Sequence, residues 1–275
     1  MSSVPNHLPN LDEPYPVEQN KVNSYQRDGH VLLRHVARTQ EIDAYRPLIE
    51  RHVFGSDKAG VPLEQRDAYR RAFVQIANLW EIDKQVARFT CARRFARIAA
   101  ELMGVDGVRL YHDQALFKEP GGGATFWHQD EYYWPLDTDN TITMWMPLVD
   151  VPEEMGILTF ASGSHVDGPL CDRAISQDSN EALERIIQQR SFPIHRDPMR
   201  AGDATFHTGW TIHAAPANTT DAVREIMTII YYADGARLIE PDNEHRPADL
   251  ERWFPGRGPG DLADSKLNPL LYKAE

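Results

Sequence analysis

The chain has 275 residues, of which 41% are hydrophobic and 25% are charged, a composition typical of one globular domain with a substantial buried core. Its 41 acidic residues outnumber its 29 basic ones, giving a formal net charge of −12, and no run of basic residues occurs. Since such a chain gains little from neutralising phosphate groups, we expect no nucleic-acid partner, and the same balance argues mildly against a strongly anionic substrate.

Cysteine usage and the chain start bear on the cellular setting. Cys91 and Cys171 stand in unlike contexts, so we expect neither a disulfide framework nor a cysteine metal site. Residues 1–16 are polar and proline-rich and lack the apolar core of a signal peptide. No apolar run approaches the roughly 20 residues that span a bilayer. We therefore expect a cytoplasmic protein without a membrane partner, and the sequence does not indicate the oligomeric state.

The first 105 residues or so are predicted to be mostly helical, because apolar residues recur there at helical spacing. Pro47 is expected to kink or break the second helix, since proline cannot donate a backbone hydrogen bond. The charged residues Arg93, Arg94 and Arg97 are interpreted as a solvated helix face. The predicted helices are 17–28, ending at Gly29, 41–53, and 84–103, ending at Gly104, with a short strand at 30–33.

Beyond Gly104 the pattern changes to short alternating segments rich in β-forming residues. In the segment 140–149, Thr143 and Trp145 are predicted to face one side, and Met144 and Met146 the other. Short strands after a helical lead-in predict a mainly β (α+β) fold, a cupin-like jelly roll braced by N-terminal helices. The predicted strands are 108–117, 140–149, 156–160, 204–207 and 225–232, with a helix at 181–189.

We expect residues 1–275 to form a single domain with three parts. Residues 1–105 make the helical lead-in and residues 106–235 the jelly-roll core. Residues 236–275, which are rich in proline, glycine and aspartate, are expected to wrap the surface of that core.

One pair of residues indicates a metal site. His128 and Asp130 lie two residues apart, so their side chains point to the same face of an extended segment. A distant histidine, His213, completes the ligands of a 2-His-1-carboxylate facial triad, which leaves one side of a non-haem Fe(II) open. We therefore predict that these three residues form the metal site and the catalytic centre.

The same tripeptide pattern occurs twice more, at His165/Asp167 and at His195/Asp197. His195 lies too close to the later histidines to leave room for the intervening strands of a jelly roll. His165 belongs to a Gly-Ser turn that runs into Gly168, and we interpret it as a loop residue. Position along the chain therefore favours His128 and its neighbour as the ligands.

Arg224 lies eleven residues after His213 in the sequence. Residues 219–221 between them have turn character, so the two residues can lie on neighbouring antiparallel strands. A guanidinium there would grip a carboxylate through two parallel hydrogen bonds. An isolated arginine at a strand start would be interpreted as half of a structural salt bridge. Beside the triad we predict instead an anchor for a dicarboxylate.

Several segments together resemble the phytanoyl-CoA dioxygenase (PhyH-like) family of Fe(II)/2-oxoglutarate-dependent oxygenases. The likeness covers roughly residues 20 to 235, and its most specific part is the order His128, Asp130, His213, Arg224. The matching segments are 127–130, 133–137, 143–151, 156–158, 163–165, 202–203, 206–207, His213, Asn218 and Arg224.

The resemblance implies a double-stranded β-helix in which the triad holds iron, 2-oxoglutarate chelates the metal, and Arg224 binds the far carboxylate. It also implies a co-substrate pocket lined by Trp145 and Thr143, with Gln114 and Lys118 as further candidates. The implied reaction consumes O2, releases succinate and CO2, and hydroxylates a C–H bond; an aspartate ligand favours hydroxylation, desaturation or cyclisation over halogenation.

In one respect the chain departs from the family pattern. Family members often carry a hydroxyl residue two positions after the distal histidine, and here that position is Ala215. Thr143 or Thr228 would then have to supply the missing hydrogen bond. His207 is a further candidate, as a residue that orients a ligand.

Aromatic residues beside the triad are candidates for the substrate pocket, with core packing as an equal alternative: Tyr132, Tyr133, Trp134 and Trp210. Residues 54–65 are a candidate lid with hinges at Gly55 and Gly60. We expect a small neutral or hydrophobic substrate, such as a secondary-metabolite intermediate, in preference to a CoA thioester. Two other functions stay open: a cupin-type metalloenzyme that does not use 2-oxoglutarate, and a non-catalytic jelly-roll binding protein.

Overall fold

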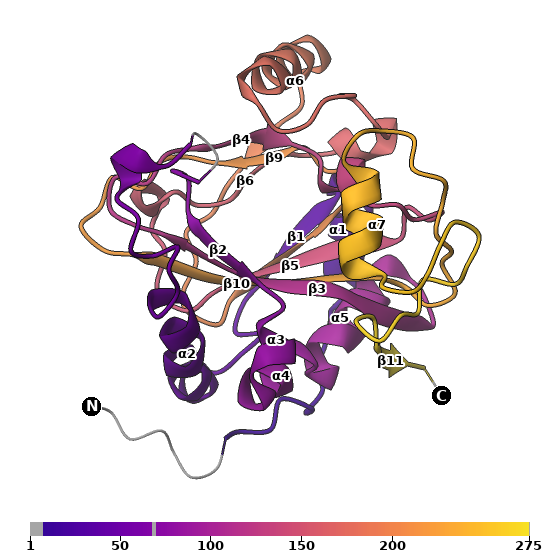
Figure 1. Cartoon of the computed structure of the whole chain (residues 1–275), viewed down its shortest axis with the longest axis horizontal. Helices are drawn as coiled ribbons and strands as arrows, with labels where there is room; N and C mark the ends of the chain where they lie inside the picture. Colours follow the sequence, from indigo (N-terminus) through magenta and orange to yellow (C-terminus); the bar gives the residue numbers. More distant parts are fainter. Residues whose placement is uncertain (1–7, 68–69, 275) are drawn as a thin grey trace.

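Two antiparallel sheets face each other in the computed structural model, which describes residues 8–67 and 70–274 (Figure 1). The larger sheet has the order β1 (His30–Leu33), β8 (Ala204–Thr208), β5 (Thr141–Pro147), β10 (Arg224–Ala233), β3 (Gly107–Lys118), β11 (Leu270–Lys273), and β2 (Val74–Ala77) also pairs with β3. The smaller sheet has the order β4 (Thr125–His128), β9 (His213–Ala215), β6 (Thr159–Ala161), β7 (Ile194–His195). The predicted jelly roll is confirmed.

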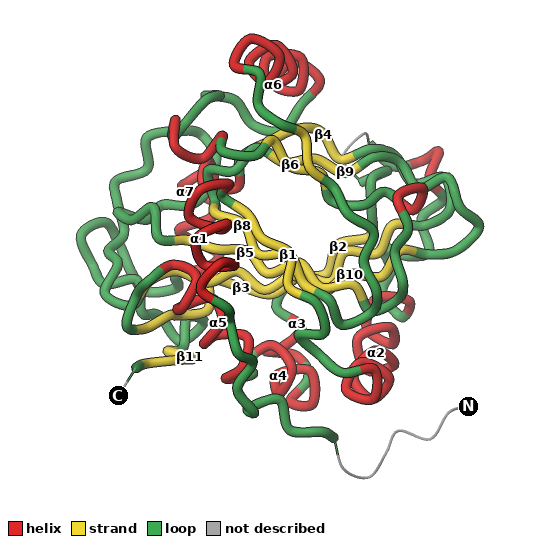
Figure 2. Tube along the Cα trace, turned by 180° about the vertical axis from the view of Figure 1, so that it is seen from behind, coloured by secondary structure: helices red, strands yellow, loops and turns green. Residues whose placement is uncertain are grey.

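Helices cover the outer faces of the two sheets (Figures 1 and 2). Those of the N-terminal part lie against the larger sheet, as predicted, and α6 lies over the smaller one. The helices are α1 (Gln19–Asp28), α2 (Thr39–Phe54), α3 (Leu79–Ile82), α4 (Lys84–Thr90), α5 (Arg93–Met103), α6 (Gln177–Arg190) and α7 (Arg246–Trp253). Short 3₁₀ helices lie in the connections of the described chain: η1 (Leu63–Gln65), η2 (Asp130–Tyr133), η3 (Glu153–Met155) and η4 (Ser164–Asp167).

Glycines end two of the predicted helices where expected. Gly29 follows α1 with a φ of 76°, and Gly104 follows α5 with a φ of 70°, both in the left-handed conformation that glycine adopts without strain. Pro47, in contrast, does not break α2, which continues through it to Phe54, so of the two predicted effects only a kink stays open. Tyr45 and Ile49 are buried on its inner face, and this packing holds the helix together across the missing hydrogen bond.

The segment 84–103 forms two helices instead of the one predicted, with the break at Cys91 and Ala92. Of the charged run there, Arg93 is exposed and Arg97 partly exposed, as predicted, whereas Arg94 is buried. Its side chain is 5% exposed and pairs with Glu41 of α2, with 2.7 Å between Nη1 and Oε2. The strand β2 and the helix α3 were also missed, because each has only four residues and shows no clear periodicity.

The side chains of strand β5 alternate between two environments, as predicted. Met144 and Met146 face the core that the larger sheet shares with the helices. Trp145 and Thr143 face the space between the sheets. The strand predicted at 156–160 is shorter and starts later, as β6 (Thr159–Ala161), because Gly156 turns the chain after η3 with a φ of 81°.

The sequence suggested that the tail beyond residue 235 wraps the surface. In the structure it also contributes regular elements. It forms α7, and its β11 adds to the edge of the larger sheet beside β3. In the described part of the chain, no helix has both the length and the apolar character needed to cross a membrane.

Candidate active site

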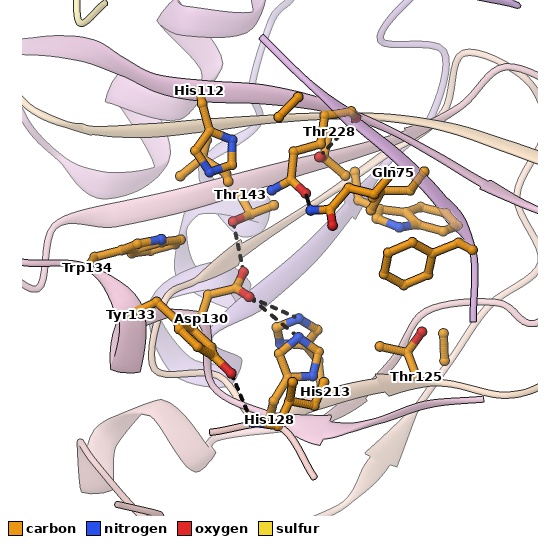
Figure 3. Close-up of a pocket in the computed structure, with 18 of the residues that line it drawn as sticks. Gln75, His112, Thr125, His128, Asp130, Tyr133, Trp134, Thr143, His213 and Thr228 are labelled. Carbon is orange, nitrogen blue, oxygen red and sulfur yellow. Dashed lines mark hydrogen bonds and ion pairs between the residues drawn. The ribbon is translucent and has the colours of Figure 1, made fainter. Parts of the chain in front are cut away.

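The three predicted metal ligands meet at one end of the smaller sheet. His128 ends β4 and His213 begins β9, and the two are direct partners in the ladder. Asp130 opens η2, two residues further on. One ligand atom from each residue lies within 4.8 Å of the others, and this is the only group of its kind that the described residues form. Figure 3 shows the three side chains converging.

Backbone carbonyls orient both imidazoles. Nδ1 of His128 lies 2.7 Å from the carbonyl oxygen of Phe126, and Nδ1 of His213 lies 2.9 Å from that of Thr211. Since a carbonyl only accepts, each Nδ1 carries the proton and donates it. The bare Nε2 atoms therefore point to Asp130 Oδ1, at 3.5 Å and 3.7 Å. This arrangement fits a metal ion, whose imidazole ligands commonly donate their second N–H to a fixed acceptor.

The electrostatics keep Asp130 ready to bind a cation. Burial raises the pKa of this carboxyl, but the neighbouring His213 and His128 outweigh burial and hold the pKa well below its usual value. Burial, followed by the charge of His128, lowers the pKa of His213 well below its usual value. The carboxylate is therefore ionised and the buried imidazole neutral, which are the states that ligate metals.

Two further side chains contact the Asp130 carboxylate. Thr143 Oγ1 donates to Oδ2 at 3.2 Å, and His207 Nε2 lies 3.5 Å from the same oxygen. Thr143 thus orients a predicted metal ligand. Thr228, the other hydroxyl considered, donates to the carbonyl of Gln114 at 3.2 Å. Ala215 lines the same cavity without a polar group.

A cavity of about 500 Å³ between the two sheets contains this group. The predicted residues that line it are His128, Asp130, His213, Arg224, Trp145, Thr143, Gln114, Tyr133 and Trp134. Lys118, Tyr132 and Trp210 are not among its lining residues. Trp210 Nε1 donates to Asp139 at 2.7 Å, and Tyr132 packs its ring against Tyr133 and His245.

Arg224 begins β10 and lies in the cavity wall with only 1% of its surface exposed. Nη1 donates to the carbonyl of Gly156, and the guanidinium carbon lies 5.4 Å from the ring centroid of Trp145. Among the described residues no carboxylate pairs with it, and its Nε has no partner. Burial lowers the pKa of Arg224 to about 9, as expected of a cation without a counter-charge.

Lys118 is a second buried basic residue, next to Arg224. It pairs with Arg224 across β3 and β10, and its Nζ donates to the carbonyls of Gly123 at 2.6 Å and Pro216 at 2.9 Å. Burial, helped by the charge of Arg224, lowers the pKa of Lys118 to about 6. A charged Lys118 beside Arg224 is therefore costly unless an anion binds next to both side chains, which suits a dicarboxylate co-substrate.

Several lining residues were not predicted. His112 lies on the inward face of β3, a position that strand alternation from Gln114 would have indicated. His207, already a candidate from the sequence, lines the cavity from β8. Other lining residues come from the lead-in and the tail, where no sequence pattern predicts a cavity position: Lys58, Phe73, Gln75, His245, Asp249, Arg252 and Trp253. Lys58 lies within the proposed lid 54–65, whose movement stays a prediction.

The two alternative His-x-Asp pairs are elsewhere. His195 and Asp197 form an exposed surface pair, with 2.9 Å between Nε2 and Oδ2. His165 lies in η4, where its Nε2 is 3.2 Å from the carbonyl of Gln26. Neither belongs to a group of three ligands in the described chain, as the position argument predicted.

Jelly rolls that bring two imidazoles and a carboxylate together at a buried arginine form the class of Fe(II)- and 2-oxoglutarate-dependent dioxygenases. The chain belongs to the phytanoyl-CoA dioxygenase (PhyH) family, whose sequence model matches residues 25–226. It is accordingly a dioxygenase that uses iron, 2-oxoglutarate and O2. This membership decides against the cupin-type enzyme without 2-oxoglutarate and against the non-catalytic binding protein.

Similar proteins come from curated sequences and solved structures. An ectoine dioxygenase from Streptomyces avermitilis is 24% identical over 264 residues, covering 87% of this chain and 88% of the relative. The carbocyclase SnoK from nogalamycin biosynthesis has a TM-score of 0.76 and 26% identity, covering 96% of this chain and 99% of that one. The epimerase SnoN, solved with Fe3+, alpha ketoglutarate and nogalamycin RO, has a TM-score of 0.73 and 26% identity, covering 92% and 98%.

Proposed function

We propose that His128, Asp130 and His213 bind the catalytic Fe(II) and that Arg224 binds the far carboxylate of 2-oxoglutarate. The observation that carries this proposal is the guanidinium of Arg224, which is buried in the cavity wall without a carboxylate partner among the described residues. A buried charge of this kind is retained at a cost unless a ligand compensates it. A dicarboxylate between the triad and Arg224 compensates it.

The remaining co-substrate residues lie on β3 and β5, the two strands that flank β10. The ring of Trp145, on β5, packs against the guanidinium of Arg224. Gln114, on β3, lines the cavity on the other side of β10. Lys118 does not line the cavity and acts through its charge from its position beside Arg224. Thr143 contributes by holding Asp130, so we assign it to the iron as much as to the co-substrate.

When bound, iron and 2-oxoglutarate supply O2 activation coupled to decarboxylation, with succinate and CO2 as products. This chain's share is to orient and to exclude water. The carbonyls of Phe126 and Thr211 fix the imidazoles, and Trp145 and Leu158 shield the co-substrate end of the cavity. The most direct outcome is hydroxylation of an unactivated C–H bond on the substrate.

We propose a small secondary-metabolite intermediate as that substrate. The similarity to SnoK and SnoN, both from nogalamycin biosynthesis, supports this choice. So do the aromatic rings that line the cavity away from Arg224, among them Trp134 and Trp253. The carbocyclase and epimerase names of those two proteins keep cyclisation and epimerisation as alternative outcomes to hydroxylation.

We propose that the chain forms one catalytic domain. The lead-in contributes β1, which pairs with β8, and β2, which pairs with β3. The tail contributes β11 to the same sheet and four residues to the cavity wall. Lead-in, core and tail therefore share one sheet and one cavity, which supports a single folding unit.

The experiment is a succinate-release assay on a panel of candidate substrates that includes ectoine and polycyclic natural products, with O2 uptake recorded in parallel. We expect uptake that requires 2-oxoglutarate and yields one succinate for each oxidised substrate. His213→Ala should abolish both signals and Arg224→Leu should raise the concentration of 2-oxoglutarate required. O2 uptake by an iron-loaded protein that proceeds equally without 2-oxoglutarate would contradict the proposal.

A further inference from the structure

Away from Arg224, the cavity runs on to an end that neither the metal nor the co-substrate uses. The ladder places Thr143, Ile230 and His112 in one row across β5, β10 and β3. Two strand spacings, about 10 Å, separate the backbones of Thr143 and His112. Thr143 donates to Asp130, and His112 lines the same cavity as both of them, so the row leads from the metal site to His112. Figure 3 shows His112 facing the same space as Thr143 and Trp134.

The His112 imidazole is buried, and among the described residues its Nδ1 atom is left without a hydrogen-bond partner. It is 5% exposed, it lines the cavity, and its Nδ1 has no hydrogen-bond partner within the described residues. Burial lowers the pKa of His112 to about 3, so the ring is neutral and offers one donor and one acceptor. An unsatisfied buried polar group is costly, which makes a ligand hydrogen bond there favourable.

Aromatic rings surround this imidazole. Trp253 of α7 lies at 4.3 Å between ring centroids with an interplanar angle of 35°, and Tyr133 and Trp134 add two more walls. Asp249, also of α7, lines the same end and accepts from Tyr111 at 3.0 Å. We call His112, Tyr133, Trp134, Asp249 and Trp253 the distal chamber. Flat apolar walls with a few fixed polar groups suit a ring that carries hydroxyl groups.

The charges favour an uncharged ligand over an anionic one. Apart from Arg224, the cations that line the cavity are Lys58 and Arg252, and both are exposed at its rim. Lys58 Nζ donates to the carbonyl of Gln75 at 2.9 Å, and the Arg252 guanidinium lies 4.3 Å from the ring centroid of Trp253. Inside the distal chamber the one formal charge is the carboxylate of Asp249, which repels anions.

We propose that the distal chamber binds an uncharged, hydroxylated ring of the substrate, and that a hydroxyl of this ring forms a hydrogen bond with His112. The ring then spans the row from His112 to the metal site, so that the bond to be oxidised lies on the side opposite that hydroxyl. This inference rests on the proposed function and names its substrate class. It makes His112 a specificity-determining residue.

The test compares two ligands of the same shape, 4-methylphenol and 1,4-dimethylbenzene. Their dissociation constants are measured by ligand-observed NMR on the full chain loaded with Zn(II) and 2-oxoglutarate, which gives a diamagnetic sample. An apolar pocket without a partner favours the hydrocarbon, because the phenol must lose its water. We expect wild type to bind the phenol at least about tenfold more tightly, the size of one good hydrogen bond.

Variants assign the preference to one residue. His112→Phe keeps an aromatic ring without nitrogen and should bring the ratio of dissociation constants to about one. His112→Asn keeps a donor and an acceptor and should restore part of the preference. His195→Phe makes the same change on the exposed surface, outside the cavity, and should leave the ratio unchanged.

The outcomes separate this inference from the proposed function. Equal binding of both ligands by wild type, or an undiminished preference in a folded His112→Phe, overturns the role of His112. If His112→Phe does not fold, the wild-type ratio together with His112→Asn decides. Tighter binding of 4-methylbenzoate than of the phenol overturns the uncharged class. None of these measurements needs iron chemistry, whereas failure to form an Fe(II)–2-oxoglutarate complex overturns the proposed function alone.

Discussion

His128 and His213 are direct partners on β4 and β9, with their ring centroids 4.1 Å apart, although they lie far apart in the sequence. The spacing of the two imidazoles is therefore a property of one strand ladder. Helix α6 supports this ladder from outside, where Asn180 Oδ1 accepts from the backbone N–H of Trp127 at 3.0 Å. Asp130 reaches the pair only because the chain turns into η2 immediately afterwards.

Removing one imidazole should remove the metal without unfolding the protein. We expect His213→Ala to lower Fe(II) affinity by at least ~100-fold, since loss of even a residue that only supports a ligand costs about 10–100-fold. Anaerobic calorimetry measures the affinity, and circular dichroism checks the fold. His195→Ala, in the exposed pair, is the control and should bind Fe(II) like wild type. Unchanged affinity in His213→Ala would place the metal elsewhere.

Arg224 should couple 2-oxoglutarate binding to stability. A ligand that binds only the folded chain stabilises it by about 2.7 kcal/mol at a hundred times its dissociation constant. We expect 2-oxoglutarate to raise the melting temperature of wild type in the presence of Fe(II) without O2. Arg224→Leu should lose most of this increase at the same concentration. An equal increase in wild type and Arg224→Leu would show that the arginine does not hold the co-substrate.

Lys118 should take up a proton when 2-oxoglutarate binds. Its pKa is lowered to about 6 in the free protein, so at pH 8 the amine is neutral. A carboxylate near Arg224 and Lys118 favours the charged form and raises that pKa. Calorimetry at pH 8 in buffers of different ionisation enthalpy should therefore report uptake of up to one proton, and Lys118→Met should report less.

The same residue gives the free protein a pH-dependent stability. The folded pKa of about 6 lies below the unfolded value of 10.5, so the unfolded chain binds more protons between these limits. The cost of burying Lys118 is thus fully present below pH 6 and is relieved as the pH rises toward 10.5. Urea denaturation at several pH values should show wild type gaining stability relative to Lys118→Met across that window. A flat difference would contradict the lowered pKa.

The buried pair of Arg94 and Glu41 should matter for folding and not for chemistry. Removing one partner of a buried ion pair leaves the other charge uncompensated and costs about 3–5 kcal/mol. We expect Arg94→Met to lower the free energy of unfolding by about that amount. Glu41→Gln added to Arg94→Met should recover part of the loss, because the glutamine is uncharged. Urea denaturation measures both, and additive losses in the double variant would rule out the pair as the cause.

The site was predictable where it depends on spacing, and less so where it depends on distant segments. His128 and Asp130 share a face because strand side chains alternate, and the order of strands identified His213 and Arg224 as their companions. The geometry now brings these residues to one cavity.

What the sequence could not indicate was decided by tertiary contacts. Arg94 looks solvated because its helix carries a charged run, but Glu41 on another helix buries it. The tail looks like a surface wrap because it is rich in proline and glycine, yet its α7 carries Asp249 and Trp253 into the cavity. In both cases the deciding partner lies more than 50 residues away, beyond the reach of any local pattern.

The central claim is that the three ligands and Arg224 assemble one iron and one 2-oxoglutarate, and an anaerobic titration tests it most directly. Fe(II) and 2-oxoglutarate added together should produce the weak visible charge-transfer band of their chelate, saturating at one of each per chain. Arg224→Leu should shift the titration to higher 2-oxoglutarate, and His213→Ala should abolish the band. A band of full intensity in His213→Ala would contradict the account.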